Sequence, residues 1–187
     1  MSELKEIWYA AGCFWGAQKF FKLVNGVEST EVGFANGHTD NPTYEEVYTD
    51  TTGYAECVYV RYNPEKISLK KLTELYFKII DPLSLNKQGE DVGTRYRTGV
   101  YYKSDPKTES KILPSHTEDE DLAVLKEVFE QVKKELNVNS MPVELQPLER
   151  FFPASEYHQD YLDKNPGGYC HLNPELFRYA RSLNSKD

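Results

Sequence analysis

Hydrophobic positions along the chain predict strands and helices that alternate. Runs in which every second residue, or nearly every residue, is apolar are typical of strands, whereas apolar residues at every third or fourth position predict amphipathic helices. The predicted strands span residues 7–11, 27–35, 54–62, 95–102 and 142–148. The predicted helices span residues 13–24, 43–47, 68–80, 117–136, 155–162 and 173–183. The charged stretch 103–121 is expected to be a surface excursion.

This order of elements indicates the fold class. Strands separated by single helices favour a two-layer α/β (α+β) sandwich, and the long irregular connections favour a mixed sheet over a purely parallel one. With 187 residues the chain is long enough for one sizeable core. We therefore expect residues 1–187 to form a single domain, and we expect a monomer.

Charge and cysteine content argue against several classes of protein. The formal charge is -8 and no stripe of Lys and Arg occurs, which argues against nucleic acid as a partner. No apolar stretch approaches the ~20 residues that a bilayer span requires, so we expect no membrane association. Three cysteines without a secretory signal fit a reducing compartment, and we expect a cytoplasmic protein.

The most informative stretch is Gly12-Cys13-Phe14-Trp15-Gly16, which follows a short apolar run. Glycines allow a sharp turn, so the thiol of Cys13 is expected where a strand gives way to a helix. Unpaired N–H groups at a helix start favour the thiolate, which predicts a lowered pKa for Cys13. The alternative is a small apolar side chain in the core. Residues 10–13 also resemble a lipoprotein cleavage box, but the preceding apolar run is too short for a signal.

Glu56 is the second informative residue, because strand alternation places it on the same face as Val58 and Val60. Burial of that carboxyl would raise its pKa and let it act as an acid near neutral pH. The alternative is a salt bridge to Arg61 or Arg97. Cys57 alternates to the opposite face and is expected to be a core residue.

Other candidate groups lie in turn-rich segments. Cys170 follows a Pro/Gly-rich stretch, where a thiol could approach Cys13 and form a transient disulfide or could be a spare exposed thiol. Tyr44 and Tyr96 could donate hydrogen bonds to a ligand oxygen, and Asp91 could orient them, although each also fits an ordinary surface position. No CxxC, HxxxH or HExxH spacing occurs, so we expect no metal site.

Six motifs in a fixed order extend over nearly the whole chain. They are residues 12–16 (GCFWG), 41–47 (NPTYEEV), 52–56 (TGYAE), 88–91 with 93–97 (QGED and GTRYR), 157–159 (YHQ) and 165–170 (NPGGYC). Together they resemble the A-type peptide methionine sulfoxide reductases. The resemblance implies a ferredoxin-like core and no cofactor. It also implies that the protein reduces the S epimer of methionine sulfoxide, both in proteins and as the free amino acid. Such a reaction would repair proteins after oxidative damage.

The resemblance also implies a role for each matched residue. Cys13 matches the nucleophile and Glu56 the acid, while Cys170 matches a resolving cysteine that forms a disulfide with Cys13 for thioredoxin to reduce. The groups expected around the sulfoxide oxygen are Tyr44, Tyr96 and Asp91. The residues expected to bind the rest of the substrate are Gly12, Phe14, Trp15 and His158.

The chain departs from the family pattern at two places, and two interpretations other than a reductase stay open. Tyr54 stands where the family commonly has His, and Asn36-Gly37 stands where it has Gly-Gly. A thiol hydrolase or amidotransferase would pair Cys13 with His158 or His171 and a carboxylate. A non-catalytic, Tyr-rich peptide-binding module is the third possibility.

Overall fold

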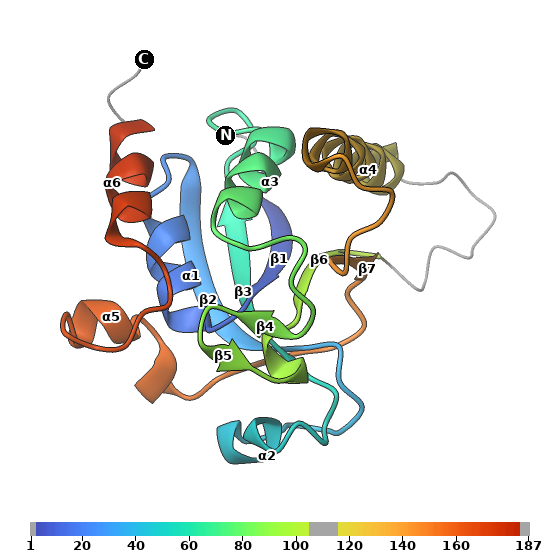
Figure 1. The fold of residues 1–187 in the computed structure, drawn as a ribbon. Helices are drawn as coiled ribbons and strands as arrows, with labels where there is room; N and C mark the ends of the chain where they lie inside the picture. The colour runs from blue at the N-terminus through green and yellow to red at the C-terminus, as the bar shows by residue number, and fades with distance from the viewer. Residues whose placement is uncertain (1–2, 105–115, 184–187) are drawn as a thin grey trace.

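A six-stranded mixed sheet forms the centre of the molecule (Figure 1). The computed structural model describes residues 3–104 and 116–183. The strand order is β7-β6-β1-β3-β2-β8, and every neighbouring pair is antiparallel except β6 and β7, which are parallel. The strands of this sheet are β1 (Lys5–Ala11), β2 (Val27–Ala35), β3 (Ala55–Tyr62), β6 (Thr98–Tyr102), β7 (Glu144–Pro147) and β8 (Phe151–Pro153).

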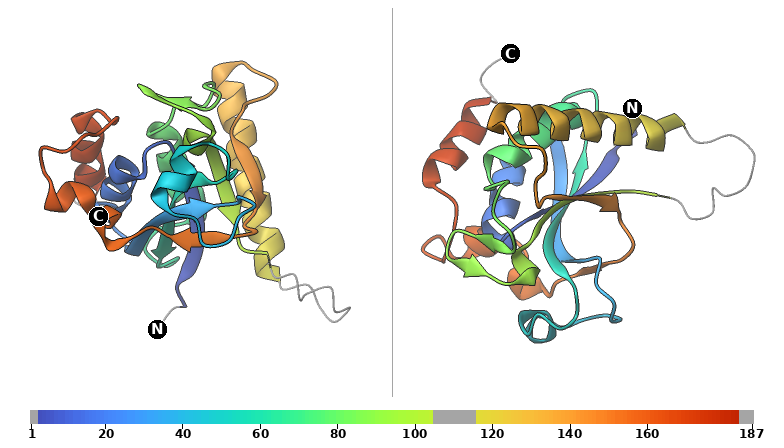
Figure 2. Two further views of the ribbon diagram at one scale, coloured as in Figure 1. Left: turned by 90° about the horizontal axis from the view of Figure 1, so that it is seen from below. Right: turned by 45° about the vertical axis from the view of Figure 1, so that its right-hand side comes forward.

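The longer helices pack on one face of the sheet. α1 lies beside α6 and α3 lies beside α4, so the helices form a second layer (Figure 2). The helices are α1 (Phe14–Lys22), α2 (Tyr44–Tyr48), α3 (Leu69–Lys78), α4 (His116–Leu136), α5 (Tyr161–Lys164) and α6 (Pro174–Ser182), with short 3-10 turns at η1 (Thr94–Tyr96) and η3 (Glu156–His158). The predicted two-layer arrangement with a mixed sheet is confirmed, while the ferredoxin-like core stays a prediction.

The two faces of the sheet differ in what covers them. The main core lies between the sheet and the helices and includes Tyr9, Val58 and Leu72, each fully buried. A smaller cluster on the opposite face contains Cys57 and is covered by side chains such as that of Phe151. Alternation along β3 therefore separates Cys57 from Glu56, as the pattern predicts.

Side chains that accept backbone N–H groups begin the helices where the sequence predicts them. Thr43 accepts from Glu46 at the start of α2 in a full capping box, and Ser68 accepts from Lys71 at the start of α3. Asn173 caps α6, and a proline follows at its first position. The starts of these three helices were therefore predictable from local chemistry.

Three predicted segments differ from the structure. The loop at 84–94 contains a small hairpin of β4 (Lys87–Gln88) and β5 (Asp91–Val92). The predicted helix at 155–162 is divided into η3 and α5, because Asp160 adopts a φ of 53° that no α-helix accommodates. The predicted strand at 95–102 begins only at Thr98, because Thr94–Tyr96 form the turn η1. In addition, strand β8 was not predicted, since three residues are too short for a hydrophobic pattern. Most of the surface excursion expected at 103–121 lies outside the described residues.

The membrane prediction can be compared with the helices directly. Within residues 3–104 and 116–183, no helix is both long and apolar enough to cross a bilayer.

Candidate active site

Cys13 lies at the junction of β1 and α1, as the glycine pattern predicts. It occupies the N-cap position of α1 and is 6% exposed. Gly12 turns the chain with a φ of 77°, and a Cβ there would lie 2.7 Å from Cβ of Gln88 and 3.3 Å from Nε2 of His171. Only glycine satisfies both the conformation and the space, so Gly12 fixes the direction in which the thiol points.

The pKa of Cys13 departs from the prediction. Burial raises the pKa of the thiol well above its ordinary value, and the negative charge of Glu56 raises it further. The backbone N–H of Trp15 lowers it, which is the expected contribution of the helix start. The predicted lowering was wrong for this resting state, because removal of the thiol from water outweighs one hydrogen bond.

Glu56 is buried beside Cys13. Its side chain is 2% exposed, and Oε1 accepts a hydrogen bond from the backbone N–H of Phe14 at 3.1 Å. Burial raises the pKa of this carboxyl to about 8, although the Phe14 N–H and the charge of Arg95 lower it. The salt bridge considered as an alternative does not form with Arg97, which instead pairs with Glu144 at 2.7 Å. Glu56 is therefore largely protonated at neutral pH and can act as an acid.

Tyr44 and Tyr96 face the same region from α2 and η1. Burial raises the pKa of both hydroxyls, and the charges of Glu56 and Cys13 raise them further, so both remain proton donors. Arg95 covers the ring of Tyr96 with its guanidinium 4.4 Å from the ring centroid. It is held in turn by Asp50, whose carboxylate accepts the Arg95 backbone N–H at 3.0 Å. Sequence analysis missed Arg95, because a cation on an aromatic ring has no linear signature.

Asp91 and His171 lie beside Cys13. Asp91 accepts a hydrogen bond from the Tyr169 hydroxyl at 3.0 Å, and its charge raises the pKa of both Cys13 and Glu56. Nε2 of His171 lies 3.2 Å from the carbonyl oxygen of Ala11. Burial lowers the pKa of His171, so its ring is neutral at pH 7. From the sequence, His171 was considered only as a possible partner of a hydrolase thiol.

Cys170 packs against the first turn of α1. Its Sγ lies 2.9 Å from the place where a Cβ on Gly16 would be, which makes Gly16 necessary for this approach. Gly16 and Cys13 are three residues apart and therefore lie on one side of the helix. Both Cys13 and Cys170 are free thiols. The second glycine of the motif thus serves the approach of a distant segment rather than the turn.

Trp15, His158 and Tyr44 form an aromatic wall. The indole N–H of Trp15 donates to Nδ1 of His158 at 3.1 Å, and the His158 ring stacks on Tyr44 with centroids 4.4 Å apart. Trp15 also stacks on Tyr161 at 3.7 Å. Phe14 is 1% exposed and packs under this wall against Phe34. Phe14 therefore supports the wall from below, whereas Trp15 lines the neighbouring cavity.

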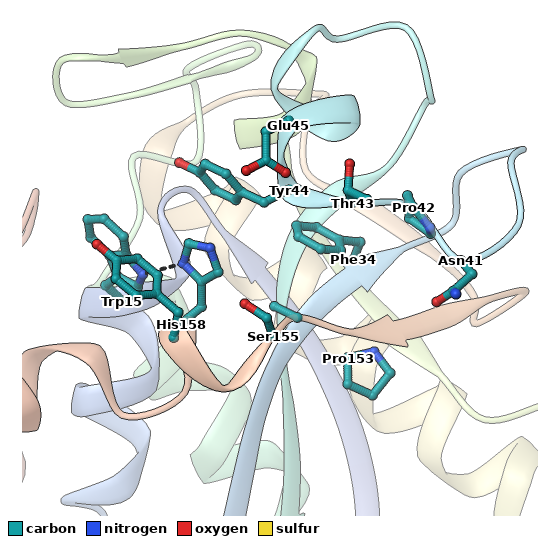
Figure 3. A pocket seen from close by; sticks show the side chains of 12 residues that line it. Trp15, Phe34, Asn41, Pro42, Thr43, Tyr44, Glu45, Pro153, Ser155 and His158 are labelled. Atoms are coloured by element: carbon teal, nitrogen blue, oxygen red, sulfur yellow. Dashed lines mark hydrogen bonds between the residues drawn. The ribbon is translucent and has the colours of Figure 1, made fainter.

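A cavity of about 700 Å³ opens beside the aromatic wall. Figure 3 shows Trp15, Tyr44 and His158 on one side of it and Asn41 and Pro153 on the other. Cys13 and Glu56 are not among the residues that line this cavity, but Phe14, which follows Cys13, packs against His158 of the wall. The space therefore accommodates more of a ligand than the few atoms that react.

Asn36 and Tyr54, which differ from the family pattern, hold the loop that leads to Tyr44 in place. Asn36 adopts a φ of 55°, a conformation that Asn and Gly favour, and its Oδ1 accepts the backbone N–H of Glu149 at 2.7 Å. The ring of Tyr54 packs on Gly37, and its hydroxyl donates to the carbonyl of Thr39. Neither residue touches the thiol, and both contribute to the placement of α2.

Comparison with known proteins agrees with the resemblance. A family model described as peptide methionine sulfoxide reductase matches residues 5–186. The peptide methionine sulfoxide reductase MsrA of Clostridium acetobutylicum is 45% identical over 177 residues, covering 94% of this chain and 99% of the relative. The crystal structure of Mxr1 from Saccharomyces cerevisiae in reduced form matches with a TM-score of 0.79 at 35% identity, covering 91% of this chain and 92% of that chain. Mxr1 in complex with Trx2 matches the fold with a TM-score of 0.54 at 24% identity, covering 85% of each chain.

Proposed function

Because the chain belongs to the peptide methionine sulfoxide reductase family, we propose that Cys13 and Glu56 together reduce the sulfoxide of an oxidised methionine. The observation that carries this proposal is the hydrogen bond from the Phe14 N–H to Glu56 Oε1 at 3.1 Å. It holds a buried acid next to the residue that bears the thiol. Nucleophile and proton donor can therefore reach the two ends of one S–O bond.

The first step transfers oxygen from the substrate to Cys13. The thiolate of Cys13 forms a bond to the sulfoxide sulfur while Glu56 protonates the oxygen. The resulting hydroxyl then moves from the substrate sulfur to the Cys13 sulfur, as the S–O bond of the substrate and the new S–S bond both break and Glu56 is left as a carboxylate. The products are the methionine thioether and the sulfenic acid of Cys13, so the substrate sulfur gains two electrons and the Cys13 sulfur loses them. A protonated Glu56 also removes the negative charge that otherwise opposes formation of the thiolate.

The second step removes the oxygen as water. The thiol of Cys170 attacks the sulfur of the Cys13 sulfenic acid, a disulfide forms, and the hydroxyl leaves with the proton of Cys170. The packing of Cys170 against Gly16 supports this role, because it places the second thiol at the first turn of the helix that Cys13 caps. The disulfide then needs an external dithiol.

Specificity for one epimer follows from three contacts around a tetrahedral sulfur. Tyr44 and Tyr96 donate to the oxygen, Trp15 offers an apolar surface to the methyl group, and Cys13 approaches from a third direction. Only one arrangement of substituents satisfies all three contacts, and the resemblance to the family implies that it is that of the S epimer. Unoxidised methionine leaves the donors without a partner, which disfavours its binding.

The nature of the substrate and of the reductant follows from the surroundings of the site. The cavity of about 700 Å³ is large enough for residues that flank a sulfoxide in a peptide, so peptides and proteins as well as free methionine sulfoxide are substrates. Mxr1 was crystallised with Trx2, which supports a thioredoxin as the dithiol that reduces the disulfide between Cys13 and Cys170.

Peptides that carry either sulfoxide epimer test this mechanism. Turnover is measured with dithiothreitol and, separately, with a thioredoxin system, for the native protein and for Cys170→Ser, with Cys57→Ser as the matched control. We expect reduction of the S epimer only, and loss of thioredoxin-driven but not dithiothreitol-driven turnover in Cys170→Ser. Equal turnover of Cys170→Ser with both reductants would remove Cys170 from the mechanism.

A thiol hydrolase deserves a direct comparison, because His171 and Asp91 lie beside Cys13. A hydrolase histidine is oriented by a carboxylate, whereas Nε2 of His171 binds the carbonyl of Ala11. Dimedone traps a sulfenic acid but not an acyl-enzyme. A dimedone adduct on Cys13 after sulfoxide treatment of Cys170→Ser supports reduction, and ester turnover without an adduct supports hydrolysis.

A further inference from the structure

Three potential metal ligands from distant parts of the sequence meet beside the thiol. Cys13 comes from the turn after β1, Asp91 from β5 and His171 from the segment before α6. Their ligand atoms all lie within 4.8 Å of one another. The absence of linear zinc motifs predicts no such group, because the fold and not the spacing along the chain brings these residues together.

The imidazole of His171 is oriented as in a metal site. A carbonyl oxygen can only accept, so Nε2 donates its proton to Ala11 at 3.2 Å, and in this tautomer of the imidazole Nδ1 carries a free electron pair. Nδ1 is buried and has no hydrogen-bond partner among the described residues. Histidines that bind metals usually donate their other N–H to a backbone carbonyl or a carboxylate, which fixes the tautomer.

Asp91 repeats this arrangement. Oδ1 accepts a hydrogen bond from the Tyr169 hydroxyl at 3.0 Å, while Oδ2 is buried without a partner in the described part of the chain. Unpartnered buried polar atoms are uncommon, because each leaves a solvation cost without compensation. Asp91 and His171 both lie beside Cys13, and each carries a buried electron-pair donor without a partner among the described residues. A bound cation would satisfy both donors.

We propose that reduced Cys13, together with His171 and Asp91, binds a divalent cation of the zinc class. A thiolate, an imidazole and a carboxylate form a ligand set typical of zinc, and tetrahedral Zn²⁺ with ligands at ~2.0 to 2.3 Å separates them by roughly 3.5 Å. A contraction of at most about 1.3 Å from 4.8 Å is within reach of side-chain rotation. A fourth position stays open to water.

Binding of the cation changes the state of the thiol. The Cys13 S–H loses its proton to solvent as the metal–sulfur bond forms, and no electron is transferred. The bound sulfur can then neither attack a sulfoxide nor join Cys170 in a disulfide. Zinc-class cations are thus reversible inhibitors that compete with substrate, and they bind the reduced enzyme only.

Direct binding tests this proposal without reliance on the reductase activity. Zn²⁺ is titrated into the reduced, chelator-treated protein against a chromophoric chelator, and Co²⁺ is used as a spectroscopic probe for thiolate coordination. The variants are Cys13→Ser and His171→Ala, with His171→Gln in case the alanine variant does not fold. The matched controls are Cys57→Ser and His38→Ala, a histidine that packs on Gly53 outside the proposed site.

We expect one tight equivalent of Zn²⁺ and a thiolate-to-Co²⁺ charge-transfer band in the native protein and both controls. His171→Ala or His171→Gln should weaken Zn²⁺ at least 10-fold, and Cys13→Ser should abolish the Co²⁺ band. Zinc should inhibit native turnover, and addition of a chelator should restore it. The zinc concentration needed for inhibition should be higher in the His171 variant. Zn²⁺ affinities of the Cys13 and His171 variants within twofold of native, or a Co²⁺ complex without thiolate, would overturn the proposal.

Discussion

Replacement of Glu56 by Gln should slow catalysis strongly and at the same time stabilise the fold. Gln has the same shape, and its side-chain oxygen can still accept the N–H of Phe14. It cannot donate a proton as a carboxylic acid does. Because general acid catalysis contributes about 10²- to 10⁴-fold, we expect kcat to fall by that factor. The native rate should also fall above pH 8 as Glu56 ionises, and Glu56→Gln should lack this limb.

The gain in stability follows from proton linkage. The ordinary pKa of this carboxyl is 4.5 and the folded value is about 8, so the folded state binds the proton more tightly than the unfolded state. Native stability therefore declines as pH rises from 4.5 to 8, because the unfolded chain can ionise and the folded chain cannot. At about 1.4 kcal/mol per pH unit, Glu56→Gln gains on the order of 3 kcal/mol at pH 7 and 5 kcal/mol at pH 8 and above.

Urea unfolding at pH 5, 6, 7 and 8 measures this difference. The free energy of unfolding of Glu56→Gln minus that of the native protein should rise over the series and level off above pH 8. The control is Glu65→Gln, which makes the same substitution at an exposed position in the turn after β3. A constant difference for Glu56→Gln would refute the argument, because it would mean that Glu56 titrates alike in the folded and unfolded states.

Two further predictions concern the groups around this acid and the second thiol. Tyr44→Phe and Tyr96→Phe each remove one donor to the sulfoxide oxygen, so each should lower kcat/KM about 10-fold or more, and the double variant should lose more than either; single variants that match native kinetics would exclude a role in holding the oxygen. Gly16→Ala places a Cβ 2.9 Å from Sγ of Cys170, so thioredoxin-driven turnover should fall several-fold while dithiothreitol-driven turnover stays near native. Equal losses with both reductants would show that the substitution disturbs Cys13 rather than the approach of Cys170.

The sequence by itself determined most of the helices and strands and pointed to the groups that we propose to react. Period-two and helical patterns predicted the central strands and the long helices, because burial of one face dictates which positions are apolar. The glycines around Cys13 predicted its place at a strand-to-helix turn, and alternation along β3 predicted the burial of Glu56. These features are local, so residues close along the chain were enough to identify them.

Only the tertiary structure decided how those groups behave and which distant residues join them. The pKa of Cys13 is raised because burial outweighs the helix start, and the extent of burial depends on segments far along the chain. Cys170 packs on Gly16, and Asp91 lies beside His171, only because segments far apart in the sequence pack together. Contacts of this kind carry no period in the sequence, since packing and desolvation act through space rather than along the backbone.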